Sequence, residues 1–123
     1  MKLNNYFDKI YVLNLHKRKD RFRDIDSRLK RFGIEYERFG ATDGSVMKPI
    51  WEKFYTDNKN FTNPNYLACS VSHLSIYKDA IENNYHRILI IEDDILINRN
   101  IHLIFDSVVI PEWDDLFYLG YIP

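Results

Sequence analysis

Short apolar runs alternate along the chain with longer stretches in which apolar residues recur at helical spacing. The runs are typical of strands, and the longer stretches of amphipathic helices. Strand, helix and strand in succession form the opening of a right-handed βαβ unit. We therefore expect a three-layer α/β fold around a largely parallel sheet. The strands are expected near residues 9–15, 35–40, 87–92 and 115–119, and the main helices near residues 19–32 and 66–83.

The apolar positions also predict which face each helix buries. In the first helix the predicted stripe consists of Phe22, Ile25, Leu29 and Phe32, and Gly33 is well placed to end the helix. In the second helix it consists of Leu67, Val71, Leu74, Tyr77 or Lys78, and Ile81. Small residues fill the first turns of this second helix, which would let the sheet or a ligand approach its backbone closely. Further short helices are compatible with residues 50–55 and 101–105.

The acidic end of the third predicted strand is the leading candidate for a functional site. Glu92, Asp93 and Asp94 directly follow the apolar run Ile88–Ile91. Ligands of open α/β sheets bind outside the carboxyl ends of the strands. Adjacent carboxylates repel one another, and oxygen ligands suit Mg²⁺ or Mn²⁺. The spacing predicts a divalent metal that holds a phosphorylated ligand, with Asp94 as the direct ligand; a solvated acidic turn is the alternative.

A basic segment follows the first predicted strand. It contains Asn14, Leu15, Arg18 and Arg21. An arginine fork binds phosphate bidentately, and the start of the following helix adds free N–H groups. The alternative is an ordinary exposed helix start. Basic groups after one strand and acids after another, at the same sheet edge, together predict a metal–diphosphate site.

Two further positions could complete such a site. Asp43, in the turn after the second strand, could accept a ribose hydroxyl, although a plain turn is the alternative. His73 could donate to a phosphate or sugar oxygen; a half-buried histidine bonded to a backbone carbonyl is the alternative. Cys69 and His73 also have the i, i+4 spacing of a metal pair, but no further Cys or His cluster supplies the other ligands.

Composition narrows the classes of function. The 123 residues fit one domain, and a net charge of −1 gives no reason to expect nucleic acid or an anionic membrane as an obligatory partner. The single cysteine excludes an internal disulfide and favours a reducing compartment. The N-terminus has no apolar signal core, and no window approaches the ~20 apolar residues of a membrane span. We therefore expect a cytoplasmic chain without a membrane span.

The order of these motifs resembles glycosyltransferase family 25, which includes lipooligosaccharide and collagen galactosyltransferases. The matching segments run along nearly the whole chain, in family order. They are Tyr11–Leu15 with Arg18 and Asp20-Arg21, Phe39–Gly44, Ser72–Leu74, Ile91–Asp94, Trp113-Asp114 and Tyr118–Gly120.

The resemblance implies a GT-A fold, which is Rossmann-like, with a UDP-sugar donor and a divalent metal, Mn²⁺ or Mg²⁺. It implies that Asp94 and Glu92 hold the metal. The implied donor-binding residues are Asn14, Leu15, Arg18, Arg21, Asp43, His73, Glu92 and Asp93. The implied activity is that of a hexosyltransferase, which transfers a sugar such as galactose or glucose to a glycan or hydroxylated protein acceptor, with inversion. Lipopolysaccharide biosynthesis and protein glycosylation are the corresponding processes. The catalytic base is left unassigned; Asp43 and Asp114 are the acids considered.

Members of this family usually continue well beyond the Tyr118–Gly120 segment. We therefore expect residues 1–123 to form a single family 25-like domain, incomplete at its C-terminus, that is the donor-binding part. An incomplete sheet leaves an unpaired apolar edge, which favours a homo-oligomer. One alternative is a non-catalytic nucleotide-sugar-binding or protein-interaction module, which turnover would distinguish. Another is a phosphoacceptor receiver domain, in which the acidic pair follows the first strand rather than the third.

Overall fold

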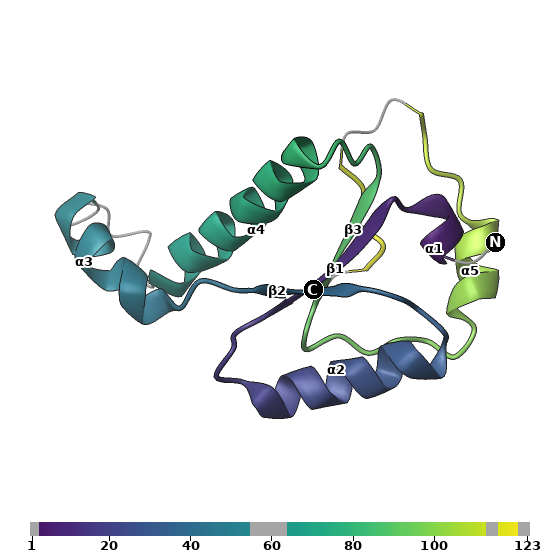
Figure 1. Ribbon diagram of the computed structural model, residues 1–123, viewed down its shortest axis with the longest axis horizontal. Helices are drawn as coiled ribbons and strands as arrows, with labels where there is room; N and C mark the ends of the chain where they lie inside the picture. The colour runs from purple at the N-terminus through teal and green to yellow at the C-terminus, as the bar shows by residue number, and fades with distance from the viewer. Residues whose placement is uncertain (1–2, 55–63, 113–115, 121–123) are drawn as a thin grey trace.

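The computed structural model describes residues 3–54, 64–112 and 116–120. Its elements in chain order are α1 (Leu3–Tyr6), β1 (Lys9–Asn14), α2 (Lys19–Arg31), β2 (Glu37–Gly40), α3 (Gly44–Phe54), α4 (Pro64–Glu82), β3 (Ile88–Glu92) and α5 (Ile101–Ser107). The three strands pair in parallel in the order β2–β1–β3. Figure 1 shows α2 and α4 on opposite sides of this sheet. The predicted layered α/β architecture with a parallel sheet is confirmed.

β1 is the central strand, and its register sets which strand ends meet. Leu13 lies opposite Phe39 of β2 and Glu92 of β3. Because all three strands run in the same direction, their carboxyl ends reach the same edge of the sheet. Every residue of β1 after Lys9 is buried, as expected for a strand covered on both faces.

Alternating side chains of the sheet divide the core into two layers. One layer packs Ile10, Val12 and Ile91 against residues of α1, α2 and α5, namely Leu3, Ile25, Leu29 and Phe105. The other packs Tyr11 and Leu13 against Ile76 of α4. The hydroxyl of the fully buried Tyr11 donates a 2.6 Å hydrogen bond to Asp79 Oδ2, which satisfies its polar atom. Burial and this carboxylate raise the pKa of the Tyr11 phenol.

The buried face of α2 agrees with the sequence pattern, whereas that of α4 does not. Ile25 and Leu29 are buried, with Phe22 and Phe32 packed against the same cluster, and Gly33 adopts a φ of +65° after the helix. In α4 the buried residues are Ala68, Ser72, Ile76 and Ala80. The predicted stripe was therefore wrong: Leu74 and Ile81 are 62% and 75% exposed. Small residues at i, i+4 spacing let the helix lie close to the sheet, and that contact outweighs the larger apolar residues beside them.

The prediction of a fourth strand near residues 115–119 was also wrong for the described part of this segment. Residues 116–120 form no strand, and Leu116 and Tyr118 are 63% and 74% exposed. A strand needs a neighbour that satisfies its backbone groups, and none of the described strands pairs with this segment. The helix expected at residues 50–55 begins earlier, at Gly44, and α5 lies where a short helix was expected. None of the described helices combines the length and apolar character that crossing a membrane requires.

Candidate functional site

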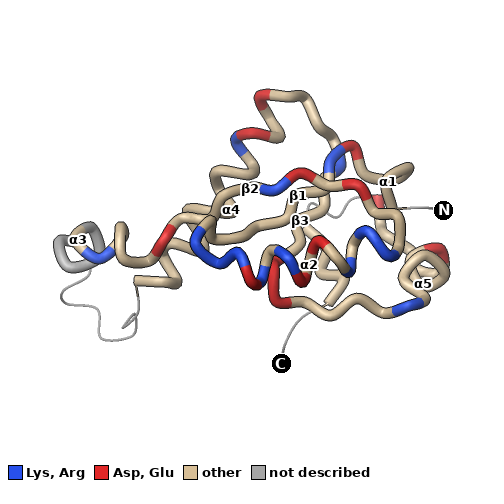
Figure 2. Tube along the Cα trace, turned by 60° about the horizontal axis from the view of Figure 1, so that its bottom comes forward, with Lys and Arg blue, Asp and Glu red and all other residues tan. Residues whose placement is uncertain are grey.

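A cavity of about 430 Å³ opens where the carboxyl ends of the three strands meet. Its walls come from the turns after β1 and β2, the first half of α4 and the acidic end of β3. Most of the predicted site residues line it, namely Leu15, Arg18, Arg21, Asp43, Glu92, Asp93 and Asp94. Asn14 and His73 instead contact residues of its lining. Figure 2 shows the charged start of α2 next to the acidic turn after β3.

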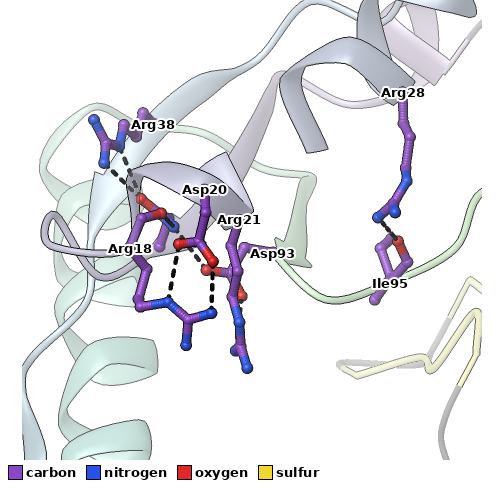
Figure 3. A network of polar contacts seen from close by, with 8 residues as sticks. Arg18, Asp20, Arg21, Arg28, Arg38, Asp93 and Ile95 are labelled. Carbon is purple, nitrogen blue, oxygen red and sulfur yellow. Dashed lines mark hydrogen bonds and ion pairs between the residues drawn. The ribbon is translucent and has the colours of Figure 1, made fainter. Parts of the chain in front are cut away.

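Asn14, at the end of β1, connects the three strand ends. Its side chain is 1% exposed, and Nδ2 donates to Asp93 Oδ2 at 2.7 Å and to the Arg18 carbonyl at 3.2 Å. Its Oδ1 accepts from Arg38 Nε at 3.1 Å and from Nη2 at 2.6 Å. Figure 3 shows this network. Both polar atoms of the Asn14 side chain are therefore hydrogen-bonded to other protein groups. The bond to Asp93 fixes that carboxylate relative to the sheet.

Asp93 is engaged on both of its carboxylate oxygens. Besides the bond from Asn14, Arg21 Nη1 lies 3.6 Å from Asp93 Oδ1, and the side chain of Asp93 is only 11% exposed. The turn after β3 is further fixed because Arg28 Nη1 donates to the Ile95 carbonyl at 3.0 Å (Figure 3). Asp94 differs, since it is exposed and has no hydrogen bond or ion pair within the described residues. Of the two aspartates, Asp94 is the one with carboxylate oxygens free for a cation.

The period-two geometry of β3 explains why neighbouring acids have different partners. Ile88 and Ile90 pack on the α4 side of the sheet, and Glu92 has the same parity. Glu92 therefore faces α4, where its Oε1 lies 3.4 Å from His73 Nε2. Asp93 turns toward α2 and meets Arg21. The acidic segment thus presents carboxylates to both sides of the sheet edge.

The guanidinium of Arg18, which was predicted to bind a phosphate, is already paired with a carboxylate. Its Nε and Nη2 donate to the two oxygens of Asp20 at 3.0 and 2.8 Å. This pairing lowers the pKa of the Asp20 carboxyl far below its ordinary range and raises the pKa of Arg18. An anion that reached Arg18 would have to compete with Asp20, whereas Arg21 meets its carboxylate partner only at 3.6 Å.

Asp43 is held in an ion pair that the sequence prediction missed. Lys17 Nζ lies 2.6 Å from Asp43 Oδ2, and the Ser45 backbone N–H donates to Oδ1 at 3.0 Å. The Lys17 contact, followed by the Ser45 bonds, lowers the pKa of Asp43 to about 2. A carboxylate with so low a pKa is a weak general base near neutral pH, which disfavours Asp43 in that role. The other acid considered, Asp114, lies outside the described residues.

The turn after β2 is attached to α4 by close contacts. The Thr42 backbone N–H donates to Ser72 Oγ at 2.8 Å, and that hydroxyl donates to the Ala68 carbonyl at 2.7 Å. A Cβ on Gly44 would lie 1.8 Å from Asn65 Oδ1 and 3.2 Å from the Asn65 Cα, so a larger residue there would have to move the Asn65 side chain. The hydrogen bonds of Ser72 therefore join this part of the cavity wall to α4.

Sequence reasoning missed three residues of this region: Lys17, Arg38 and Asn65. Lys17 lies in the basic segment after β1, in which only Arg18 and Arg21 were predicted to bind a ligand. Arg38 sits within β2, where the guanidinium stacks 4.1 Å from the centre of the Phe22 ring and reaches Asn14. The sequence signal that could have indicated this contact is an arginine inside a short strand, because a partly buried arginine needs a polar partner. Asn65 carried no local signal, because its role depends on where α3 meets α4.

The exposed carboxylates of Glu92 and Asp94 are hard oxygen ligands, a donor set that fits Mn²⁺ or Mg²⁺. A three-layer parallel fold with this charged cavity at the strand ends defines an α/β protein with a candidate site for an anionic ligand and a cation. The family model described as "Glycosyltransferase family 25 (LPS biosynthesis protein)" matches residues 7–119. The chain belongs to this family.

Curated relatives give the same family at low identity. A "Glycosyltransferase 25 family member" of Aedes aegypti is 29% identical over 126 residues, which cover 90% of this chain and 21% of that protein. Human "Procollagen galactosyltransferase 2" is 27% identical over 131 residues, which cover 93% of this chain and 21% of the human protein. The mouse protein of the same name is 28% identical over 99 residues, which cover 72% of this chain and 16% of the mouse protein. The matched region is thus about a fifth of the length of these relatives or less.

Proposed function

We propose that the chain is the donor-binding part of a GT-A glycosyltransferase that binds a UDP-sugar together with Mn²⁺ or Mg²⁺. The observation that carries this proposal is the convergence of Arg21, Asp93 and Asp94 on one cavity at the carboxyl ends of parallel strands. Membership of the family supports the glycosyltransferase class. The relatives named procollagen galactosyltransferase favour galactose as the sugar, with glucose as the alternative, and a glycan or a hydroxylated protein as acceptor.

In this proposal the acidic residues have separate tasks. Asp94 is the direct metal ligand, and Glu92 is the second carboxylate near the metal. Asp93 remains bonded to Asn14 and keeps Arg21 beside the cavity, where the guanidinium can bind a phosphate oxygen. The metal, when bound, supplies positive charge that neutralises the diphosphate leaving group. Lys17 and Asp43 form the opposite wall, where the carboxylate can accept a ribose hydroxyl.

The proposed transfer inverts the anomeric carbon, as the family resemblance implies. Direct displacement then needs a base that accepts the proton of the acceptor hydroxyl. The lowered pKa of Asp43 makes it a poor candidate, so we propose no base among the described acids. A chain that binds the donor without turnover would instead be a nucleotide-sugar-binding module built on the same fold.

Calorimetric titration with UDP and UDP-sugars, with and without Mn²⁺, tests the proposal. We expect metal-dependent UDP binding that Asp94→Asn weakens at least ~10-fold, or about 1.4 kcal/mol. The matched control is Asp106→Asn on α5, an exposed acid that does not line this cavity and should bind as the wild type does. Without metal, Asp94→Asn should not lower the melting temperature, because it only relieves repulsion between acids. Equal UDP–Mn²⁺ binding by both variants would refute the donor site.

A further inference from the structure

A thiol, an imidazole and a carboxylate, which together can bind Zn²⁺, meet on the α4 side of the cavity. Cys69 Sγ, a ring nitrogen of His73 and a carboxylate oxygen of Glu92 all lie within 4.8 Å of one another. Three side chains of these types that lie so close together can hold a metal ion. We infer that Cys69, His73 and Glu92 form a Zn²⁺ site, distinct in its ligand chemistry from the oxygen site at Asp94.

The fold brings these three residues together for two independent reasons. Cys69 and His73 are four residues apart on α4, so they occupy one face of the helix in successive turns. Glu92 lies at the end of β3 on the face that packs against α4, as the parity of Ile88 and Ile90 requires. The sequence alone offered the pair on the helix, and the tertiary structure adds the third ligand that the pair lacked.

The spacing of the group suits a tetrahedral ion. His73 Nε2 and Glu92 Oε1 are 3.4 Å apart. Two ligands at the ~2.0–2.1 Å bond lengths of zinc lie about 3.3 Å from each other in a tetrahedron. The same contact is long for a hydrogen bond. A sulfur ligand at about 2.3 Å from zinc would lie roughly 3.6 Å from the other two, so closing the group takes a side-chain movement on the order of 1 Å.

The types of ligand select the ion. Thiolate and imidazole bind Zn²⁺ in preference to Mg²⁺ or Mn²⁺, which favour all-oxygen sites. Three protein ligands leave a fourth position open, and Cys69 is exposed, so an ion can enter from solvent. In the free protein, partial burial and the nearby Glu92 raise the pKa of the Cys69 thiol. Zinc binding replaces the thiol proton, which is released to solvent.

The two metal sites share Glu92. Zinc held by Cys69 and His73 would keep the Glu92 carboxylate on the α4 side, away from a metal at Asp94. Zinc should therefore compete with Mn²⁺-dependent donor binding; this consequence rests on the proposed function, whereas the zinc site itself does not.

Cobalt substitution tests the site without any nucleotide. The chain, freed of metal and kept reduced, is titrated with Co²⁺, and the near-ultraviolet thiolate-to-cobalt absorption is recorded before Zn²⁺ is added to displace it. Because Cys69 is the single cysteine, this band reports on that residue alone. We expect the band to saturate at one equivalent of Co²⁺ and Cys69→Ser to abolish it. His73→Phe and Glu92→Gln should each weaken the Co²⁺ binding that this band reports at least ~10-fold, or about 1.4 kcal/mol.

Asp94→Asn is the matched control, since it removes the neighbouring carboxylate that is outside the group, and it should retain the cobalt band. A second readout is the rate of Cys69 alkylation, which Zn²⁺ should slow at least ~10-fold and Mg²⁺ should leave unchanged. Circular dichroism confirms that each variant is folded. Absence of the band at saturating Co²⁺, or unchanged affinity in the His73 or Glu92 variant, would overturn the inference. Neither result bears on UDP binding, so this proposal and the donor-site proposal can fail separately.

Discussion

The side-chain amide of Asn14 donates a 2.7 Å hydrogen bond to Asp93 Oδ2 and so joins the carboxyl ends of β1 and β3. Arg38 of β2 donates to the oxygen of the same amide. Asn14 is 1% exposed, so water cannot readily take its place. One buried side chain therefore sets the position of the acidic segment relative to the rest of the cavity.

Substitution of this amide should reduce both stability and ligand binding. Asn14→Ala removes the hydrogen-bond partner of two half-buried charged groups, Asp93 and Arg38. We expect the free energy of unfolding to fall by about 2 kcal/mol, measured by urea denaturation, and UDP–Mn²⁺ binding to weaken. The control is Asn5→Ala, at an exposed position of α1, which should change stability by no more than ~0.5 kcal/mol. Equal effects of the two substitutions would contradict the anchoring role.

The ion pair between Lys17 and Asp43 should be visible in a pH titration. The pKa of Asp43 is lowered to about 2, so its contribution to stability is present above about pH 4 and is lost as the pH falls toward 2. Lys17→Gln removes the main cause, and the pKa of Asp43 should rise toward its ordinary value, measured by NMR of the carboxyl carbons.

Lys30→Gln is the matched control for this titration, because Lys30 pairs with Asp26 on α2 rather than with Asp43. It should raise the pKa of Asp26 and leave that of Asp43 in place. An unchanged Asp43 titration in Lys17→Gln would show that the backbone bonds from Ser45, rather than the lysine, determine its pKa.

The hydrogen bond between Tyr11 and Asp79 should contribute to the packing of α4 on the sheet. Tyr11→Phe keeps the ring and removes a hydroxyl that is fully buried. We expect a loss of about 1–2 kcal/mol in the free energy of unfolding, since Asp79 loses its donor. Tyr118→Phe, at a tyrosine that is 74% exposed, should have no measurable effect. A neutral Tyr11→Phe would mean that solvent replaces the hydroxyl.

The edges of the sheet should cause self-association. Among the described strands β3 pairs only with β1, and its residues before Ile91 are half-buried. Unpaired backbone groups at such an edge favour pairing with another chain. We expect light scattering to show species above the 14.9 kDa monomer as the concentration rises. Ile81→Glu, on the exposed face of α4, should not change this; a monomer at all concentrations would refute the prediction.

The sequence by itself determined the elements that repeat a simple pattern. The three strands and the two main helices fall close to their predicted ranges, because short apolar runs and helical spacing indicate the type of element. The sequence also predicted that the basic segment after β1 and the acidic segment after β3 lie close together, since parallel strands bring their carboxyl ends to one edge of the sheet. The arginine-rich turn, the turn at Asp43 and the acidic end of β3 accordingly line one cavity.

Only the tertiary structure decided how these groups are paired and which face of α4 is buried. The helical pattern predicted a buried stripe on α4 that includes Leu74 and Ile81, whereas the structure buries the face with Ala68, Ser72, Ile76 and Ala80. Likewise, Asp93 meets Asn14, a contact between residues far apart in the chain. Local spacing identifies residues able to bind an ion or a phosphate, but their partners depend on packing between distant segments, which no short-range pattern encodes.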